Sequence, residues 1–145
     1  MDIYTIGFTQ RSAADFFRAL RGASIRRLVD IRVSNSSQLA GFTRKDHLPF
    51  FLEELCGAEY LHEPRLAPTL ELMVAVRKRG VTWPEYEQRF LRLLQSRRVD
   101  EQIGRDLFDV PTVLLCTEPT AERCHRRLVV EYLGRTWGDV TPHHL

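Results

Sequence analysis

Short apolar runs alternate along this chain with amphipathic segments of helical spacing, and this alternation constrains the fold more than any other feature. Residues 3–6 form one such run before Gly7, and residues 113–115 form another, ahead of a helix-like stretch over residues 128–133. A strand, helix, strand order favours parallel strands joined by right-handed crossovers. We therefore expect an α/β fold: a single three-layer α/β/α domain with a mostly parallel sheet of about five strands.

Capping residues mark the ends of the expected helices. Ser12 and Thr69 are suitable N-caps, and residues 82–85 (Thr-Trp-Pro-Glu) form a capping box with proline at the first helical position. Strands are predicted over residues 3–6, 25–33, 59–62, 111–116 and 137–140. Helices are predicted to begin at Ser12, near Pro49, at Thr69 and at Thr82, with a shorter helix over residues 101–107 and a last helix that ends at Gly134.

Length and composition indicate an ordinary folded protein. A chain of 145 residues is most simply one domain, residues 1–145, and a net charge of +2 is too small for a DNA-binding field over the whole molecule. We expect a cytoplasmic protein with no membrane partner, because no apolar run approaches the length of a membrane span and the N-terminus lacks a secretion signal. The three cysteines are then expected to be reduced thiols.

The turns that follow parallel strands lie along one edge of a sheet, so residues 7–11, 30–37, 62–69 and 116–126 should face a common crevice. Asp30 places a carboxylate inside an apolar run, where an ionised group needs a partner. Arg32 lies on the same side of that strand, and Arg126 could approach from the last helix. Asp30 is either catalytic or simply the group that fixes an arginine or caps a loop.

The densest polar cluster is residues 116–126, with two cysteines, two carboxylates, a histidine and two arginines. A Cys124 thiol in the first turn of a helix, among cations, is a candidate nucleophile. Cys124 also shares a helical face with Leu128, which favours a packed core cysteine, and Cys116 at the end of a buried strand favours packing still more. Cys124 and His125 are adjacent rather than spaced like zinc ligands, so no metal site is predicted.

Three further residues of the cluster suit an anionic ligand. Glu118 lies near the expected helix start, where it could be a general base, a ligand contact or only a cap. His125 and Arg126 lie where exposed backbone N–H groups and cations attract phosphate together. The alternative for Arg126 is packing against a local carboxylate.

Five segments together resemble domain-of-unknown-function family 488. They are residues 4–9 (YTIGFT), 28–32 (LVDIR), 60–64 (YLHEP), 114–118 (LLCTE) and 124–126 (CHR). The family pattern falls here on Gly7, Asp30, Arg32, Cys116, Glu118, Cys124, His125 and Arg126. Phe8 stands where many members have histidine, and residues 66–69 (LAPT) replace a glycine-rich stretch. The resemblance implies an α/β fold and a site, but no established reaction.

The leading hypothesis is a small intracellular enzyme, a hydrolase or a transferase, that acts on an anionic substrate related to nucleotides or nucleic acid. Its expected catalytic residues are Asp30, Glu118, Cys124 and His125, and its expected binding residues are Gly7, Arg11, Arg32 and Arg126. One alternative is a non-catalytic nucleic-acid-binding module that stacks bases on Phe8, Phe42 and Trp83. Another is a redox or metal-binding protein that uses Cys116 and Cys124. The sequence assigns no cofactor and no oligomeric state.

Overall fold

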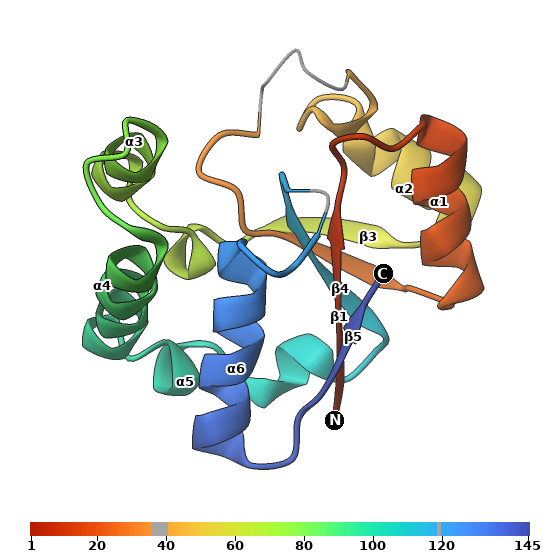
Figure 1. Ribbon diagram of the computed structural model, residues 1–145. Helices are drawn as coiled ribbons and strands as arrows, with labels where there is room; N and C mark the ends of the chain where they lie inside the picture. The colour runs from red at the N-terminus through yellow and green to blue at the C-terminus, as the bar shows by residue number, and fades with distance from the viewer. Residues whose placement is uncertain (36–40, 119) are drawn as a thin grey trace.

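A computed structural model describes residues 1–35, 41–118 and 120–145 of the chain. Its centre is a five-stranded parallel sheet in the order β3-β2-β4-β1-β5 (Figure 1). The strands are β1 (Asp2–Gly7), β2 (Arg27–Asp30), β3 (Glu59–His62), β4 (Thr112–Cys116) and β5 (Thr141–His144). The expected α/β class and parallel sheet are confirmed.

Helices cover both faces of the sheet (Figure 1). The α-helices are α1 (Ala13–Gly22), α2 (Leu48–Cys56), α3 (Leu70–Arg77), α4 (Trp83–Ser96), α5 (Val99–Gln102) and α6 (His125–Trp137). Short 3-10 turns are η1 (Gly41–Thr43), η2 (Pro64–Leu66) and η3 (Arg105–Phe108). Helices α1 and α2 pack on one face, whereas α4 and α6 pack on the other.

The strands supply both cores because successive side chains point to opposite faces of a sheet. In β4, Leu114 joins the core beneath α4 and α6, while its neighbours Val113 and Leu115 join the core beneath α1 and α2. All three are fully buried. The central strand is therefore apolar from Val113 to Leu115, and the thiol of Cys116 follows at its carboxyl end.

The predicted N-caps are confirmed. The side chains of Ser12, Thr69 and Thr82 accept hydrogen bonds from backbone N–H groups three residues later, at the starts of α1, α3 and α4. Such a cap stabilises a helix by about 1 kcal/mol and sets its first residue. The first turn of α4 is thereby fixed beside the sheet's carboxyl edge, where Trp83 and Tyr86 project.

Three boundary predictions near the C-terminus were wrong. Helix α6 passes through Gly134 and ends at Trp137, because the left-handed residue at its end is Gly138, with φ of 84°. The final strand is therefore residues 141–144 rather than 137–140. The helix expected over residues 101–107 divides into α5 and η3, with the extended Ile103 between them.

Two further predictions concern loops and membranes. Most of the loop expected over residues 34–41 lies outside the described residues. Among the residues that the structure describes, no helix combines the length and the hydropathy needed to cross a bilayer.

Candidate functional site

A cavity of about 490 Å³ opens at the carboxyl edge of the sheet. Its floor is formed by the residues that follow β2, by the end of β4 and by the start of α6, and one wall is formed by residues of α3 and α4. Figure 1 shows where these elements lie. The floor contributes thiol and imidazole groups from the buried Cys116, Cys124 and His125, and the exposed Glu118 adds a carboxylate to the lining. This is the edge at which open α/β sheets bind ligands.

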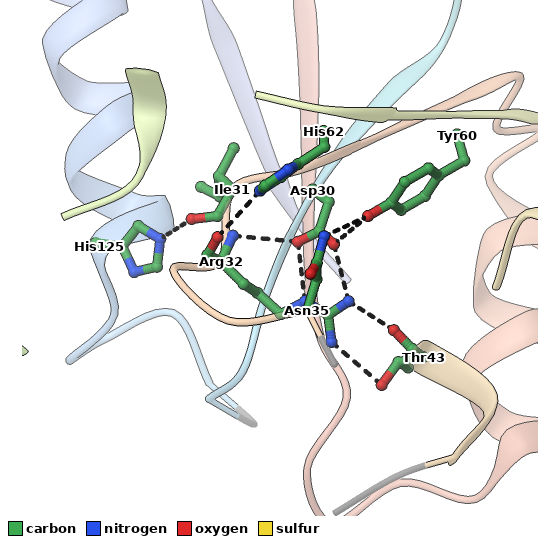
Figure 2. A network of polar contacts seen from close by, with 8 residues as sticks. All are labelled: Asp30, Ile31, Arg32, Asn35, Thr43, Tyr60, His62 and His125. Atoms are coloured by element: carbon green, nitrogen blue, oxygen red, sulfur yellow. Dashed lines mark hydrogen bonds and ion pairs between the residues drawn. The ribbon is translucent and has the colours of Figure 1, made fainter. Parts of the chain in front are cut away.

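Two thiols and an imidazole meet on the cavity floor. The Sγ of Cys116 lies 2.6 Å from the Sγ of Cys124 and 3.2 Å from Nδ1 of His125. On the far side of the ring, Nε2 lies 2.7 Å from the carbonyl oxygen of Ile31 (Figure 2). A carbonyl only accepts hydrogen bonds, so Nε2 carries a proton and Nδ1 is the atom available to exchange a proton with sulfur.

The backbone at the start of α6 explains this meeting. Cys124 is the N-cap, with an extended backbone (φ −136°, ψ 143°), and its side chain makes no capping hydrogen bond. Its thiol is therefore directed to the end of β4 instead of along the helix. His125 is the first helical residue, and the ring of Phe90 packs edge-on against its imidazole at 5.6 Å between centroids.

The two thiols differ in acidity. Burial alone would raise the pKa of Cys116, but a hydrogen bond from Cys124, backbone hydrogen bonds at Glu118 and Thr117 and the charge of Arg126 together lower it. Burial, and then the neighbouring Cys116 sulfur, raise the pKa of Cys124. Cys116 is thus the sulfur that ionises first, and Cys124 is its proton-bearing neighbour.

A second buried network holds the end of β2. The carboxylate of Asp30 accepts from the Nε and Nη2 of Arg32 at 2.9 and 2.8 Å and from the hydroxyl of Tyr60 at 2.6 Å (Figure 2). Arg32 also donates to Thr43, at 2.6 Å to its carbonyl oxygen. Asp30 is wholly buried and Arg32 is 3% exposed. The pairing expected between these two residues is present, and it is complete without a ligand.

The family model named Domain of unknown function DUF488 matches residues 12–133 of the chain. The chain belongs to the DUF488 family. The matched span includes the Asp30–Arg32 pair and the whole 116–126 cluster, and it begins after Gly7 and Phe8. No curated protein and no solved structure matches the chain.

Arg126 and Gly7, two residues expected to bind the substrate, contact the loop that follows β4 instead of lining the cavity. Arg126 is 1% exposed and donates from Nη1 to the carbonyl oxygen of Glu118 at 2.6 Å, while its Nε has no partner among the described residues. Gly7 permits this contact, since a Cβ there would lie 1.5 Å from that oxygen and 2.4 Å from Nη1. Arg126 and Gly7 therefore shape the loop after β4 and do not line the cavity.

The predicted site residues thus fall into two groups. Glu118, Cys124, His125 and Arg32 line the cavity, although the guanidinium of Arg32 is bound to Asp30. Asp30, Gly7, Arg126 and Arg11 do not line it. Arg11 lies just before α1 and forms an ion pair with Asp15 in the first turn of that helix, at 3.7 Å. Among the residues that the structure describes, Asp30 pairs with Arg32 and not with Arg126, which donates to the Glu118 carbonyl.

Four more residues line the cavity, and sequence reasoning gave none of Arg77, Arg123 and Tyr86 a role of its own, while it named Trp83 only as a stacking residue of the nucleic-acid-binding alternative. Arg77, at the end of α3, and Arg123 are exposed cations at the cavity, and neither has an ion-pair partner within the described ranges. Tyr86 and Trp83 stack at 4.8 Å on the α4 wall. Burial, and then the negative charges at Cys116, Cys124 and Glu118, raise the pKa of Tyr86, so its hydroxyl remains a donor.

Cys116, Cys124 and His125 could also hold a metal by ligand type, since their ligand atoms lie within 4.8 Å of one another. The adjacent positions of Cys124 and His125 in the sequence do not reveal that Cys116 lies close to both. Two thiolates on one tetrahedral zinc, each about 2.3 Å from the ion, lie about 3.8 Å apart. The observed 2.6 Å between the sulfurs is far shorter. The arrangement therefore suits chemistry between the sulfurs and the imidazole better than a shared metal.

Proposed function

We propose that this protein is a thiol-dependent enzyme, a hydrolase or transferase, in which Cys116 attacks an anionic substrate held in the cavity. The observation that supports this best is the pair of contacts made by the His125 ring. Its Nδ1 lies 3.2 Å from the Sγ of Cys116, and its Nε2 lies 2.7 Å from the carbonyl oxygen of Ile31. A nucleophile beside a base that is itself oriented by a third group is the general arrangement of covalent catalysis. The nucleophile is thus assigned to Cys116 rather than to Cys124.

The reaction would proceed in two balanced steps. The Cys116 thiolate forms a bond to an electrophilic carbon or phosphorus atom, and the leaving group departs with the proton from Nδ1 of His125. Water or a second acceptor then gives its proton back to Nδ1 and displaces the sulfur. Glu118, exposed at the cavity mouth, is placed to orient that acceptor.

The cavity lining supports a substrate with an anionic group and a flat apolar part. Arg77 and Arg123 supply cations that the described residues leave without carboxylate partners. The stacked Trp83 and Tyr86 supply an aromatic face, and Met73 adds a polarisable side chain. A nucleotide has both features, so we propose a nucleotide or a related compound as the substrate class.

Alkylation kinetics test the anion-binding thiol without knowledge of the substrate. Iodoacetate, an anion, and iodoacetamide, its neutral counterpart, should be compared at Cys116 by peptide mass spectrometry. We expect Cys116 to favour iodoacetate relative to the exposed thiol of free cysteine. Arg77→Gln with Arg123→Gln should lower the iodoacetate rate about tenfold and leave the iodoacetamide rate unchanged. Equal effects on the two reagents would contradict an anion-binding cavity.

Turnover of a panel of nucleoside phosphates tests the reaction itself. Cys116→Ser should abolish turnover, and His125→Asn should reduce kcat by a factor of about 10² or more. Cys56→Ser is the matched control, because Cys56 is a free, half-buried cysteine on α2, outside the cavity. A Cys116→Ser variant that keeps full turnover would disprove the thiol mechanism.

A further inference from the structure

We infer that Cys116 and Cys124 form a reversible disulfide, a redox modification site at the floor of the cavity. The disulfide itself requires only the two thiols and an oxidant. Its consequence, loss of the attacking sulfur, rests on the proposed function. Cys56, the remaining cysteine, belongs to α2 and takes no part.

The distance between the two sulfurs favours a disulfide over a shared zinc ion. At 2.6 Å, the Sγ atoms are about 0.5 Å from the 2.05 Å length of a disulfide bond, whereas a shared zinc ion would need them to separate by about 1.2 Å. Cys116 and Cys124 are each 2% exposed, so both lie out of contact with bulk solvent. Both line the cavity, through which a small oxidant reaches them.

The backbone permits the small closing movement. Cys124 is an N-cap whose side chain makes no capping hydrogen bond, so its sulfur is free to turn without the loss of a helix contact. Cys116 lies at the last position of β4, where the strand's pairing with Gly7 of β1 ends. The two positions are joined by a loop, and neither is inside a helix.

Hydrogen peroxide is the oxidant that we propose. Cys116 first gives its proton to Nδ1 of His125, 3.2 Å away. The thiolate attacks one peroxide oxygen, the O–O bond breaks, and the leaving hydroxide takes that proton from Nδ1, so that sulfenic acid and water are formed and Nδ1 is free again. Cys124 then loses its proton to Nδ1 of His125 and attacks the Cys116 sulfur. The hydroxyl group leaves with that proton as a second water. Peroxide is reduced by two electrons, and two thiols become one disulfide.

Reduction returns the site to its active form. An external dithiol, such as dithiothreitol, supplies two electrons and regenerates both thiols. The disulfide also keeps Cys116 from passing beyond sulfenic acid to the irreversible sulfinic and sulfonic acids. Cys124 thus acts as a resolving thiol for the reactive Cys116.

Thiol counting after peroxide treatment tests the inference. Reduced protein is treated with hydrogen peroxide, and the remaining thiols are labelled with a maleimide in denaturant and mapped by mass spectrometry. We expect label on Cys56 alone, a disulfide-linked pair of peptides that contain Cys116 and Cys124, and full relabelling after dithiothreitol. Cys124→Ser should instead leave Cys116 as sulfinic or sulfonic acid, and Cys56→Ser should behave as wild type.

Three outcomes would overturn the inference. They are peroxide-treated wild type with Cys116 and Cys124 still labelled, equal oxidation of all three cysteines, and stoichiometric zinc that protects both thiols until a chelator removes it. A second measurement does not depend on the folding of Cys124→Ser. Wild-type protein is titrated in buffers of oxidised and reduced dithiothreitol, and the absence of a two-electron transition would count against a disulfide between Cys116 and Cys124. Disulfide formation without any preference for iodoacetate would reject only the proposed function.

Discussion

Nε2 of His125 lies 2.7 Å from the carbonyl oxygen of Ile31, the residue between Asp30 and Arg32. The imidazole is therefore oriented by the same turn of backbone that the buried ion pair fixes at the end of β2. Arg32 closes this turn upon itself, since both its backbone N–H and its guanidinium donate to Asp30. The ion pair thus helps to fix the orientation of the His125 imidazole, although it does not contact the thiols.

Removal of the Asp30 charge should destabilise the protein strongly. Asp30→Asn leaves the buried Arg32 guanidinium without its anion, and breaking a buried pair in this way costs about 3–5 kcal/mol. Urea unfolding followed by circular dichroism measures this loss. Tyr60→Phe is the matched control, because it removes one hydrogen bond to the same carboxylate and should cost about 1.5–3 kcal/mol. A loss below about 1 kcal/mol in Asp30→Asn would show that the pair does not stabilise the fold.

Tyr60 should make stability fall at alkaline pH. Burial, followed by the hydrogen bond to Asp30, raises its pKa to about 12 from an ordinary 10.0. The folded state then favours the protonated phenol, so this contribution is full below pH 10 and is lost as the pH rises from about 10 to about 12. The free energy of unfolding of wild type should therefore drop more across this window than that of Tyr60→Phe. Parallel curves for the two proteins would contradict the raised pKa.

A methyl group at Gly7 should break the contact behind the site. Its Cβ would overlap the Glu118 carbonyl oxygen at 1.5 Å, and the two backbones cannot separate without disturbing the β1 and β4 pairing. We expect Gly7→Ala to lose about 3 kcal/mol or more in thermal or urea unfolding. Gly22→Ala is the control: an added Cβ there meets nothing within 4 Å, and a helical alanine should gain up to about 1 kcal/mol.

Local signals in the sequence predicted those parts of the fold that depend on neighbouring residues. The caps at Ser12, Thr69 and Thr82 were located correctly because a hydroxyl and an N–H group three residues later make the same contact in most folds. The end of α6 was misplaced because Gly134 and Gly138 carry the same local signal. Only the backbone conformation, left-handed at Gly138, distinguishes them.

The candidate site was located by topology, but its internal roles depend on contacts that no motif encodes. The key acceptor for His125 is the backbone carbonyl of Ile31, a group that every residue possesses. Cys124 was assigned to a helical face, whereas as N-cap it follows no helical period and turns to Cys116. The cations that line the cavity, Arg77 and Arg123, lie 46 positions apart in the sequence, and the packing of α3 against α4 brings Arg77 to the cavity.

The charge of Arg126, which does not line the cavity, should increase the fraction of Cys116 that is thiolate at a given pH. Arg126 is one of the groups that lower the pKa of the Cys116 thiol, after its hydrogen bonds to Cys124 and to the backbone at Glu118. Arg126→Met should therefore move the pH profile of iodoacetamide labelling at Cys116 upward by about one pH unit. Arg126→Lys retains the charge and should shift it less, and circular dichroism at each pH confirms that both variants remain folded. An unchanged profile in a folded Arg126→Met protein would show that the thiolate is stabilised by its hydrogen bonds alone.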